Sequence, residues 1–211
     1  FNWQDEVEGM ISQMEFVRRV DVQTETIERY VREGKLVPDL VVPMSEHRTF
    51  KYFKEETLEK YAAQYGWTLI DDSNRKELFL DMIRQMDMSY SYKPVLIKAI
   101  LLCADDKGCI KLEDIVSYFR SYYEGRRAAG LVVEKTNSIF AKGGYTDKEA
   151  ERNILANPFK RFEDMQMLRH TKTLGVVQVD DAVWKKLTKE EKAEMERICD
   201  QKLAEYFEMM G

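Results

Sequence analysis

A short polar helix that ends at a glycine and leads into a hairpin limits the possible folds of the N-terminal region more than any other feature. Residues 24–33 have a helical pattern with two arginines about one turn apart, and Gly34 ends it. An extended segment with two prolines follows, and residues 47–53 then form an aromatic and basic strand pattern. Upstream, residues 11–20 predict a first helix. This order of helix, turn, helix and hairpin is typical of domains that place their second helix in the major groove of DNA.

The composition is that of a water-soluble globular chain. Its 211 residues are 44% hydrophobic and 34% charged, which suits one large domain or two small ones. The longest apolar run, residues 95–104, is interrupted by Lys98 and is too short to span a membrane. Three cysteines without CxxC spacing, and no signal-peptide pattern, predict reduced thiols and a cytoplasmic location without a membrane partner. The chain starts with phenylalanine rather than methionine, so we expect a piece of a larger protein.

The charge of the chain is uneven along the sequence. The net charge of −5 at pH 7 argues against a binder that coats nucleic acid through bulk positive charge. Residues 89–179 are the one basic region, with fifteen Lys and Arg against eleven Asp and Glu, a difference of +4. Any phosphate-binding surface outside the first helices is therefore expected in this region.

Residue patterns for catalysis, metals and cofactors are missing from the sequence. His47 and His170 lie far apart, and no GxxxxGK[ST] phosphate loop occurs. Residues 134–136 lack the acid-x-Lys spacing of a nuclease, and Glu149 and Glu151 diverge on a predicted helix. We therefore expect no catalytic residues, no metal site and no cofactor in this chain.

Turn signals and hydrophobic periodicity divide the chain into segments. The first unit closes with a helix over residues 54–64, and the second repeats the order helix, short strand, helix, irregular segment, helix and hairpin. The predicted fold is mostly α with small β-hairpin wings, built as two winged-helix-like units plus a C-terminal helix that packs across them. The predicted segments are a winged helix-turn-helix at 1–67, a linker helix at 68–88, a second winged-helix-like domain at 89–180 and the C-terminal helix at 181–211.

Local sequence patterns predict the individual elements of the second unit. They are a helix over 94–104, a strand over 109–112, a helix over 113–124, an irregular stretch over 126–144, a helix opened by a capping box at Thr146 and Glu149, a helix over 158–165, strands over 167–170 and 174–179, and a last helix over 189–209.

Two motifs in the first unit resemble a known family. The stretch VQTETIERYVREGKL at 22–36 and the stretch FKYFKEE at 50–56, followed by apolar Leu58 and Tyr61, resemble the MerR and excisionase family of winged helix-turn-helix domains. The resemblance covers about residues 10–65 and implies a double-stranded DNA partner. Three glutamates on the second helix, and a following domain in place of a long dimerisation helix, depart from the family pattern. They favour an accessory recognition domain over an effector-responsive dimeric regulator.

The residues expected to bind DNA come from the second helix and the hairpin. Side chains at the helix start can reach base edges, the arginines can reach phosphates or bases, and the hairpin can reach the flanking backbone. Tyr30 is expected to pack in the core. The alternative is that the two arginines belong to an ordinary solvated helix face. The predicted DNA-binding residues are Gln23, Thr24, Thr26, Arg29, Arg32, His47, Arg48 and Lys51.

A second, weaker resemblance lies in the basic region. The stretch SYSYKPVLIKAIL at 89–101, together with NPFKRFEDM at 157–165, is similar to an accessory region of bacterial restriction and superfamily II helicase proteins. It implies a non-catalytic recognition module within such a DNA-processing protein. A second DNA-binding face would comprise Lys142, Lys148, Arg152, Lys160, Arg161 and Arg169, with Lys135 and Lys172 beside them.

Two other functions remain open from the sequence. The chain could be a stand-alone transcription regulator, or a protein–protein interaction module that uses its acidic ends and Met-rich helices. Methionines at helical spacing occur more often in cores than at interfaces, so the second reading competes with simple packing. The methionines concerned are Met82, Met86, Met88, Met195, Met209 and Met210.

Overall fold

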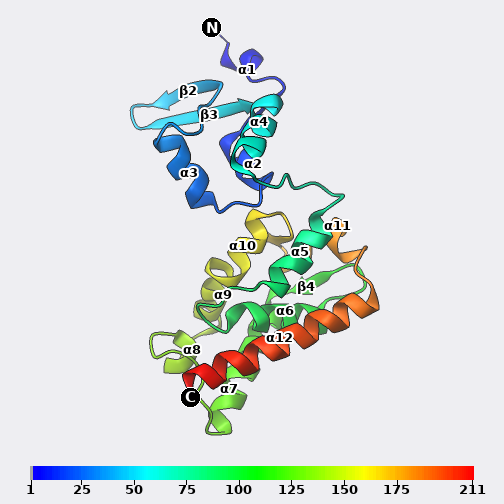
Figure 1. The fold of residues 1–211 in the computed structure, drawn as a ribbon. Helices are drawn as coiled ribbons and strands as arrows, with labels where there is room; N and C mark the ends of the chain where they lie inside the picture. The colour runs from blue at the N-terminus through cyan, green and yellow to red at the C-terminus, as the bar shows by residue number, and fades with distance from the viewer. Residues whose placement is uncertain (1) are drawn as a thin grey trace. The chain divides into compact units, whose positions relative to one another are not determined.

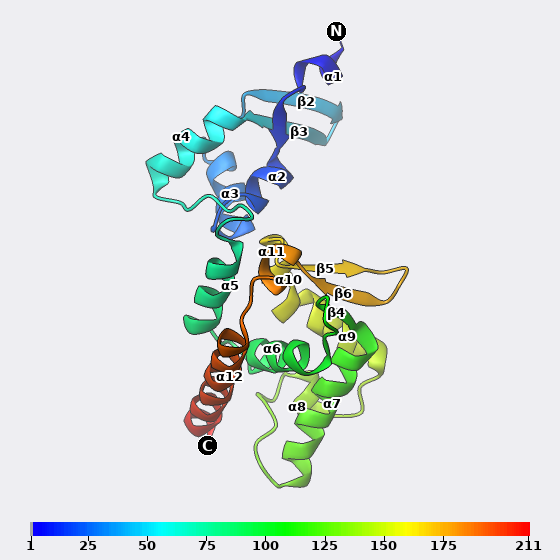
Figure 2. The same cartoon turned by 90° about the vertical axis from the view of Figure 1, so that its right-hand side faces the viewer.

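The computed structural model describes residues 2–211 and divides the chain into two compact units, with the boundary between Asp71 and Asp72 (Figures 1 and 2). The prediction of a mostly helical chain with small sheets is confirmed. The segment 68–88, expected as a separate linker helix, holds α5 (Arg75–Arg84), which packs within the second unit against α11 and α12. The C-terminal helix also packs in that unit, on α5 and α6.

The first unit combines short helices with one antiparallel sheet. The strand order is β1-β3-β2, so the first strand pairs with the third, as in the register Ile11↔Phe53. Its elements are α1 (Trp3–Glu6), β1 (Met10–Ser12), α2 (Gln13–Arg18), α3 (Thr24–Arg32), β2 (Leu40–Ser45), β3 (Arg48–Lys54) and α4 (Glu55–Tyr65).

The expectation of a continuous helix over residues 11–20 is wrong. Residues 10–12 are extended and pair with β3, and α2 begins only after Ser12. The Ser12 hydroxyl accepts a hydrogen bond from the amide of Glu15 at 3.1 Å, which caps the helix at this point. Pairing with a strand some forty residues away overrides the local helical periodicity.

The next two helices confirm the sequence prediction. Helix α3 ends at Arg32, and Gly34 takes a left-handed conformation with φ of 74° that L side chains disfavour. Helix α4 ends in the same manner at Gly66. Both helices pack on one small core, whose buried members are Phe16, Val20, Ile27, Leu36, Phe53, Leu58 and Tyr61.

The second unit has the same strand pairing inside a larger helical frame. Its sheet order is β4-β6-β5, so again the first strand pairs with the third, with Ile110 opposite Val177. Its elements are α5, α6 (Tyr92–Cys103), β4 (Cys109–Lys111), α7 (Leu112–Ala128), α8 (Ile139–Lys142), α9 (Asp147–Ala156), α10 (Pro158–Asp164), β5 (Leu168–Thr171), β6 (Val176–Val179), α11 (Asp181–Trp184) and α12 (Lys189–Met210). The expected hairpin and the capping box at Thr146 are present.

A buried carboxylate holds the irregular segment of the second unit in place. Glu134 is 5% exposed and accepts hydrogen bonds from the amides of Ser91 and Lys135, each at 2.8 Å. The hydroxyls of Ser91 and Tyr206 donate to the same carboxylate. Burial and the bond to Glu134 raise the pKa of Tyr206, so this hydroxyl stays a donor. The loop before α8 is thereby tied to α6 and to α12.

Candidate nucleic-acid interface

The outward face of α3 carries charges of both signs. Ile27 is fully buried, which fixes the opposite side of the helix as the exposed one. On that side, Glu25, Glu28, Arg29 and Arg32 are exposed. The two predicted arginines therefore face solvent, although two carboxylates stand beside them.

Ion pairs reduce the negative charge at the C-terminal end of α3. Lys35 Nζ lies 3.1 Å from one carboxylate oxygen of Glu33, and Arg29 Nε lies 4.0 Å from the other. The hydrogen bond from Lys35, followed by the nearby charges of Lys35, Arg29 and Arg32, lowers the pKa of Glu33 below its ordinary value. Since Glu33 is held by Lys35, Arg29 stays half-exposed and accessible to an anion.

Of the other predicted residues of the second helix, Gln23 is exposed, whereas Thr24 and Thr26 are half-buried. Gln23 is the N-cap residue of α3, and its side chain makes no capping hydrogen bond. Thr26 is half-buried, as is Tyr30, whose ring lies 5.1 Å from that of Tyr65 and 5.7 Å from that of Trp67. Tyr30 thus packs at the edge of the core rather than at its centre.

The hairpin presents its cations at the tip. His47 lies in the turn between β2 and β3, and Arg48 is the first residue of β3; both are exposed, and within residues 2–211 neither forms an ion pair. Lys51 lies further along β3, where its Nζ donates to Thr49 Oγ1 at 3.2 Å. These residues alternate on the strand, so Thr49 and Lys51 share one face.

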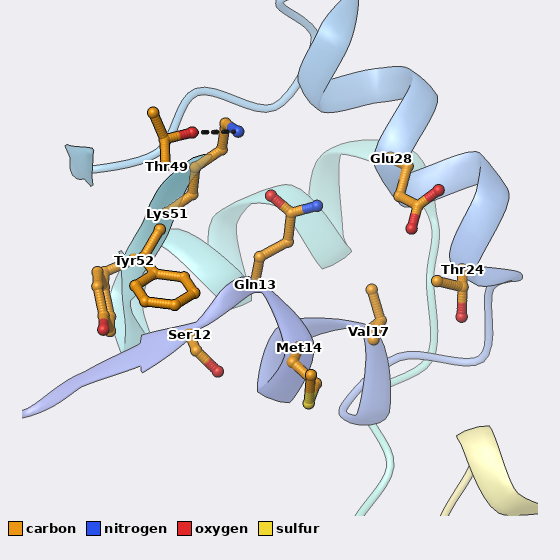
Figure 3. Close-up of a pocket in the computed structure, with 10 residues that line it drawn as sticks. Ser12, Gln13, Met14, Val17, Thr24, Glu28, Thr49, Lys51 and Tyr52 are labelled. Carbon is orange, nitrogen blue, oxygen red and sulfur yellow. Dashed lines mark hydrogen bonds between the residues drawn. The ribbon is translucent and has the colours of Figure 1, made fainter. Parts of the chain in front are cut away.

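A groove of about 470 Å³ separates the hairpin from α3 (Figure 3). The side chain of Gln13 reaches into the space between Lys51 on β3 and Glu28 on α3. Thr24 closes the groove at the start of α3. The lining residues are Ser12, Gln13, Met14, Val17, Thr24, Glu28, Thr49, Phe50, Lys51 and Tyr52.

The predicted residues thus fall into three places. Thr24 and Lys51 line the groove, the arginines of α3 face outward, and His47 and Arg48 stand at the hairpin tip. Gln13 also lines the groove but is not among the predicted residues, because the helix expected over residues 11–20 runs through it. The spacing of Ser12 and Glu15 matches a helix N-terminus and is the signal that could have revealed this site.

Several cations proposed for the second face have acidic partners. Lys160 Nζ lies 2.9 Å from Asp164, and Arg169 lies 2.8 Å from Asp180. Lys135 donates to the carbonyl of Ser89. Of the others, Arg161 is half-buried, and the exposed ones are Lys142, Lys148, Arg152 and Lys172.

A second groove, of about 460 Å³, lies beside the β5–β6 hairpin. Like the first, it is formed by the junction of a first strand with its following helix, by a later helix and by the hairpin. Among the proposed cations only Lys172 lines it. The lining residues are Lys111, Leu112, Glu113, Glu151, His170, Lys172, Leu174, Gly175 and Val176.

Across residues 2–211, no three His, Cys, Asp or Glu side chains come together in a way that could hold a metal ion. None of the helices described combines the length and the apolar character that a membrane crossing requires. Comparisons with protein-family models, with curated proteins and with solved structures give no significant match.

Proposed function

We propose that the first unit binds double-stranded DNA as a winged helix-turn-helix domain, with α3 in the major groove and the β2–β3 hairpin on the flanking backbone. The element order and the pairing of the first strand with the third support this topology. The observation that carries the proposal is the exposed cationic pair on α3, set beside a hairpin whose tip holds His47 and Arg48 without an acidic partner among residues 2–211. Phosphate contacts of this kind position a domain on the duplex.

The mixed charge of α3 sets the strength and the character of this binding. Arg29 and Arg32 can contact phosphates or guanine edges, whereas Glu25 and Glu28 repel phosphates. Affinity from α3 alone is therefore low, and the hairpin supplies the additional phosphate contacts. A unit of this strength fits an accessory recognition module of a larger DNA-processing protein, with the other parts of that protein as further partners.

Salt-dependent binding of the whole chain to a labelled DNA duplex tests the proposal. Arg48→Ala removes one phosphate contact, which at 0.1 M salt should weaken binding about eightfold and reduce the slope of log K against log salt by about 0.9. Arg29→Ala should weaken binding similarly or relax sequence preference, depending on whether it meets a phosphate or a base. Lys60→Ala, an exposed lysine on α4, is the matched control. Wild-type protein without salt-sensitive duplex binding at low ionic strength would contradict the proposal.

A protein-interaction module is the second function to consider, and one observation favours it. Met44 and Phe50 on the hairpin, and Met14 at the start of α2, are 47%, 43% and 64% exposed. Exposed apolar side chains gathered near one hairpin suit protein contacts. The Met-rich helices support this function less, because Met86 and Met195 are buried. Phe50→Ser should leave the salt slope of DNA binding unchanged if the hairpin acts through its cations.

A further inference from the structure

We propose that the groove beside the β5–β6 hairpin binds the phosphodiester backbone of a DNA duplex, with Lys111 and Lys172 as its cationic contacts. The proposal rests on the DNA-binding function inferred for the first unit. It assigns the second unit a site that shares only Lys172 with the set of cations suggested by the sequence.

The position of the groove is the first reason. Both grooves begin where a first strand passes directly into a helix, at Ser12–Gln13 in one unit and at Lys111–Leu112 in the other. Both continue along a later helix, through Glu28 on α3 and Glu151 on α9. Each is closed by the hairpin that follows, so the two units offer the same three structural parts around a groove of similar volume.

The charge of the groove is the second reason. Lys111 and Lys172 are exposed, and across residues 2–211 neither forms an ion pair. His170 on β5 adds an imidazole whose ring lies 6.4 Å from that of Phe159, edge to face. Lys111 ends β4, opposite Val176 on β6, and Lys172 lies in the turn of the β5–β6 hairpin, which extends away from the helices of its unit (Figure 2). Both lysines line the groove, so both can contact a phosphodiester that enters it.

Acidic residues in the groove should oppose the binding of a phosphate. Glu113 and Glu151 line it together with the two lysines. A phosphate held by Lys111 and Lys172 is repelled by these carboxylates, so removing one of them should strengthen binding. Lysine and glutamate variants of one groove should therefore shift affinity in opposite directions if a phosphate enters it.

Two of the cations suggested by the sequence are less suited to this contact. Arg169 is held by Asp180, which also lies 3.5 Å from the buried Arg75. Lys160 is held by Asp164. A phosphate would have to displace these carboxylates first, whereas Lys111 and Lys172 require no such exchange.

The test measures binding of the full chain to a fluorescein-labelled duplex of mixed sequence over a range of salt concentrations. Lys111→Ala and Lys172→Ala should each weaken binding about eightfold at 0.1 M salt, and the double variant should reduce the salt slope by about 1.8. Glu151→Gln should tighten binding several-fold. Lys189→Ala, an exposed lysine at the start of α12, should bind like the wild type.

The outcomes separate this site from the function on which it rests. If Arg48→Ala weakens binding while the lysine variants and Glu151→Gln bind like the wild type, the first unit binds DNA and the second groove is excluded. If the lysine variants weaken binding but Glu151→Gln does so as well, the groove does not hold a phosphate. If no variant changes a salt-insensitive affinity, both proposals fail. All the substituted side chains except Glu151 are exposed, and circular dichroism confirms that each variant is folded.

Discussion

The two units pair their strands in the same order, but they expose their positive charges differently. In the first unit, His47 and Arg48 at the hairpin tip are exposed and form no ion pair among residues 2–211, although Glu46 stands in the same turn. In the second, Arg169 on β5 is bound by Asp180, and Lys172 in the turn is the hairpin cation that forms no ion pair among residues 2–211. Strand order therefore determines where a hairpin lies, whereas ion pairing determines which of its cations are available to bind a ligand.

The units also differ in how their irregular segments are held. In the first, the loop after α3 is fixed by two hydroxyls, with Tyr61 accepting from the amide of Val37 at 3.0 Å and Tyr65 donating to the carbonyl of Lys35 at 2.8 Å. In the second, a buried carboxylate gathers donors from three elements. The second arrangement is more costly to disrupt, since its donors are left in a dry environment.

The largest expected effect is therefore that of Glu134→Ala. The substitution leaves the amides of Ser91 and Lys135, and the hydroxyl of Tyr206, without their acceptor. We expect the second unit to lose about 3 kcal/mol of unfolding free energy. Hydrogen exchange of peptides from each unit, followed by mass spectrometry, measures the change separately in the two units.

The matched control is Arg19→Ala, which breaks the half-exposed pair of Arg19 with Glu55 at 3.1 Å in the first unit. Its cost should stay below about 1 kcal/mol. Equal losses in the two units would show that burial of the carboxylate is not what distinguishes them.

A pair of glycine substitutions gives the next largest effect. Gly108 has φ of 79°, and a Cβ built on it would lie 2.6 Å from Cγ of Trp184. Gly34 has φ of 74°, and nothing lies within 4 Å of its Cβ position. Backbone strain costs about 1 kcal/mol at either site, and the clash with the indole adds about 1–3 kcal/mol for Gly108→Ala.

Hydrogen exchange of peptides from each unit, followed by mass spectrometry during heating, measures the loss of stability in the two alanine variants. Gly108→Ala should destabilise the second unit more than Gly34→Ala destabilises the first. Equal costs would mean that Trp184 can move aside, although its Nε1 donates to the carbonyl of Asp106 at 3.1 Å.

Part of the fold could be predicted from the sequence, namely the elements that local signals determine; the other elements depend on residues distant in the chain. Helix α3, the glycine after it and the capping box at Thr146 follow from local signals. Strand β1 does not, because a three-residue strand exists only through its pairing with β3. The segment 126–144, expected to be irregular, holds the end of α7 and the short helix α8, and only the stretch between them takes its order from Glu134 and partners distant in sequence.

The candidate site shows the same limit. The sequence identifies which side chains are positive, but not which of them already have a partner. The pairing of Lys160 with Asp164 follows helical spacing and could have been foreseen. The pairing of Arg169 with Asp180 depends on the approach of β5 to the end of β6, and only the structure reveals it.

Replacing the two hairpin arginines tests whether this pairing matters for binding. Arg48→Ala should weaken duplex binding about eightfold at 0.1 M salt. Arg169→Ala should leave the affinity and its salt slope unchanged, because the guanidinium of Arg169 already forms an ion pair with Asp180. A loss of affinity for Arg169→Ala equal to that for Arg48→Ala would show that DNA displaces Asp180, and the contrast between the hairpins would then disappear.

The smallest expected effect concerns pH and the packing of α12 on α5. Glu194 receives a hydrogen bond from Arg84 Nε at 3.0 Å, which lowers the pKa of its carboxyl. The pKa of Glu191 is also lowered, first by the amide of Thr188 and then by Lys76. The first unit has a comparable acid in Glu33, but its partner Lys35 is nearby in sequence and joins no second helix.

The sign of the pH effect follows from these directions. A carboxyl whose pKa is lower in the folded state stabilises the fold fully above its unfolded pKa, about 4.3, and loses this contribution as the pH falls through the folded value. Urea unfolding between pH 6 and pH 3 should therefore show Glu194→Gln less stable than the wild type at the upper end, with the gap closing toward the lower end. Glu208→Gln, on the same helix and without an ion pair among residues 2–211, should show no gap. A gap that widens as the pH falls would mean that the contact of Glu194 with Arg84 does not stabilise the second unit.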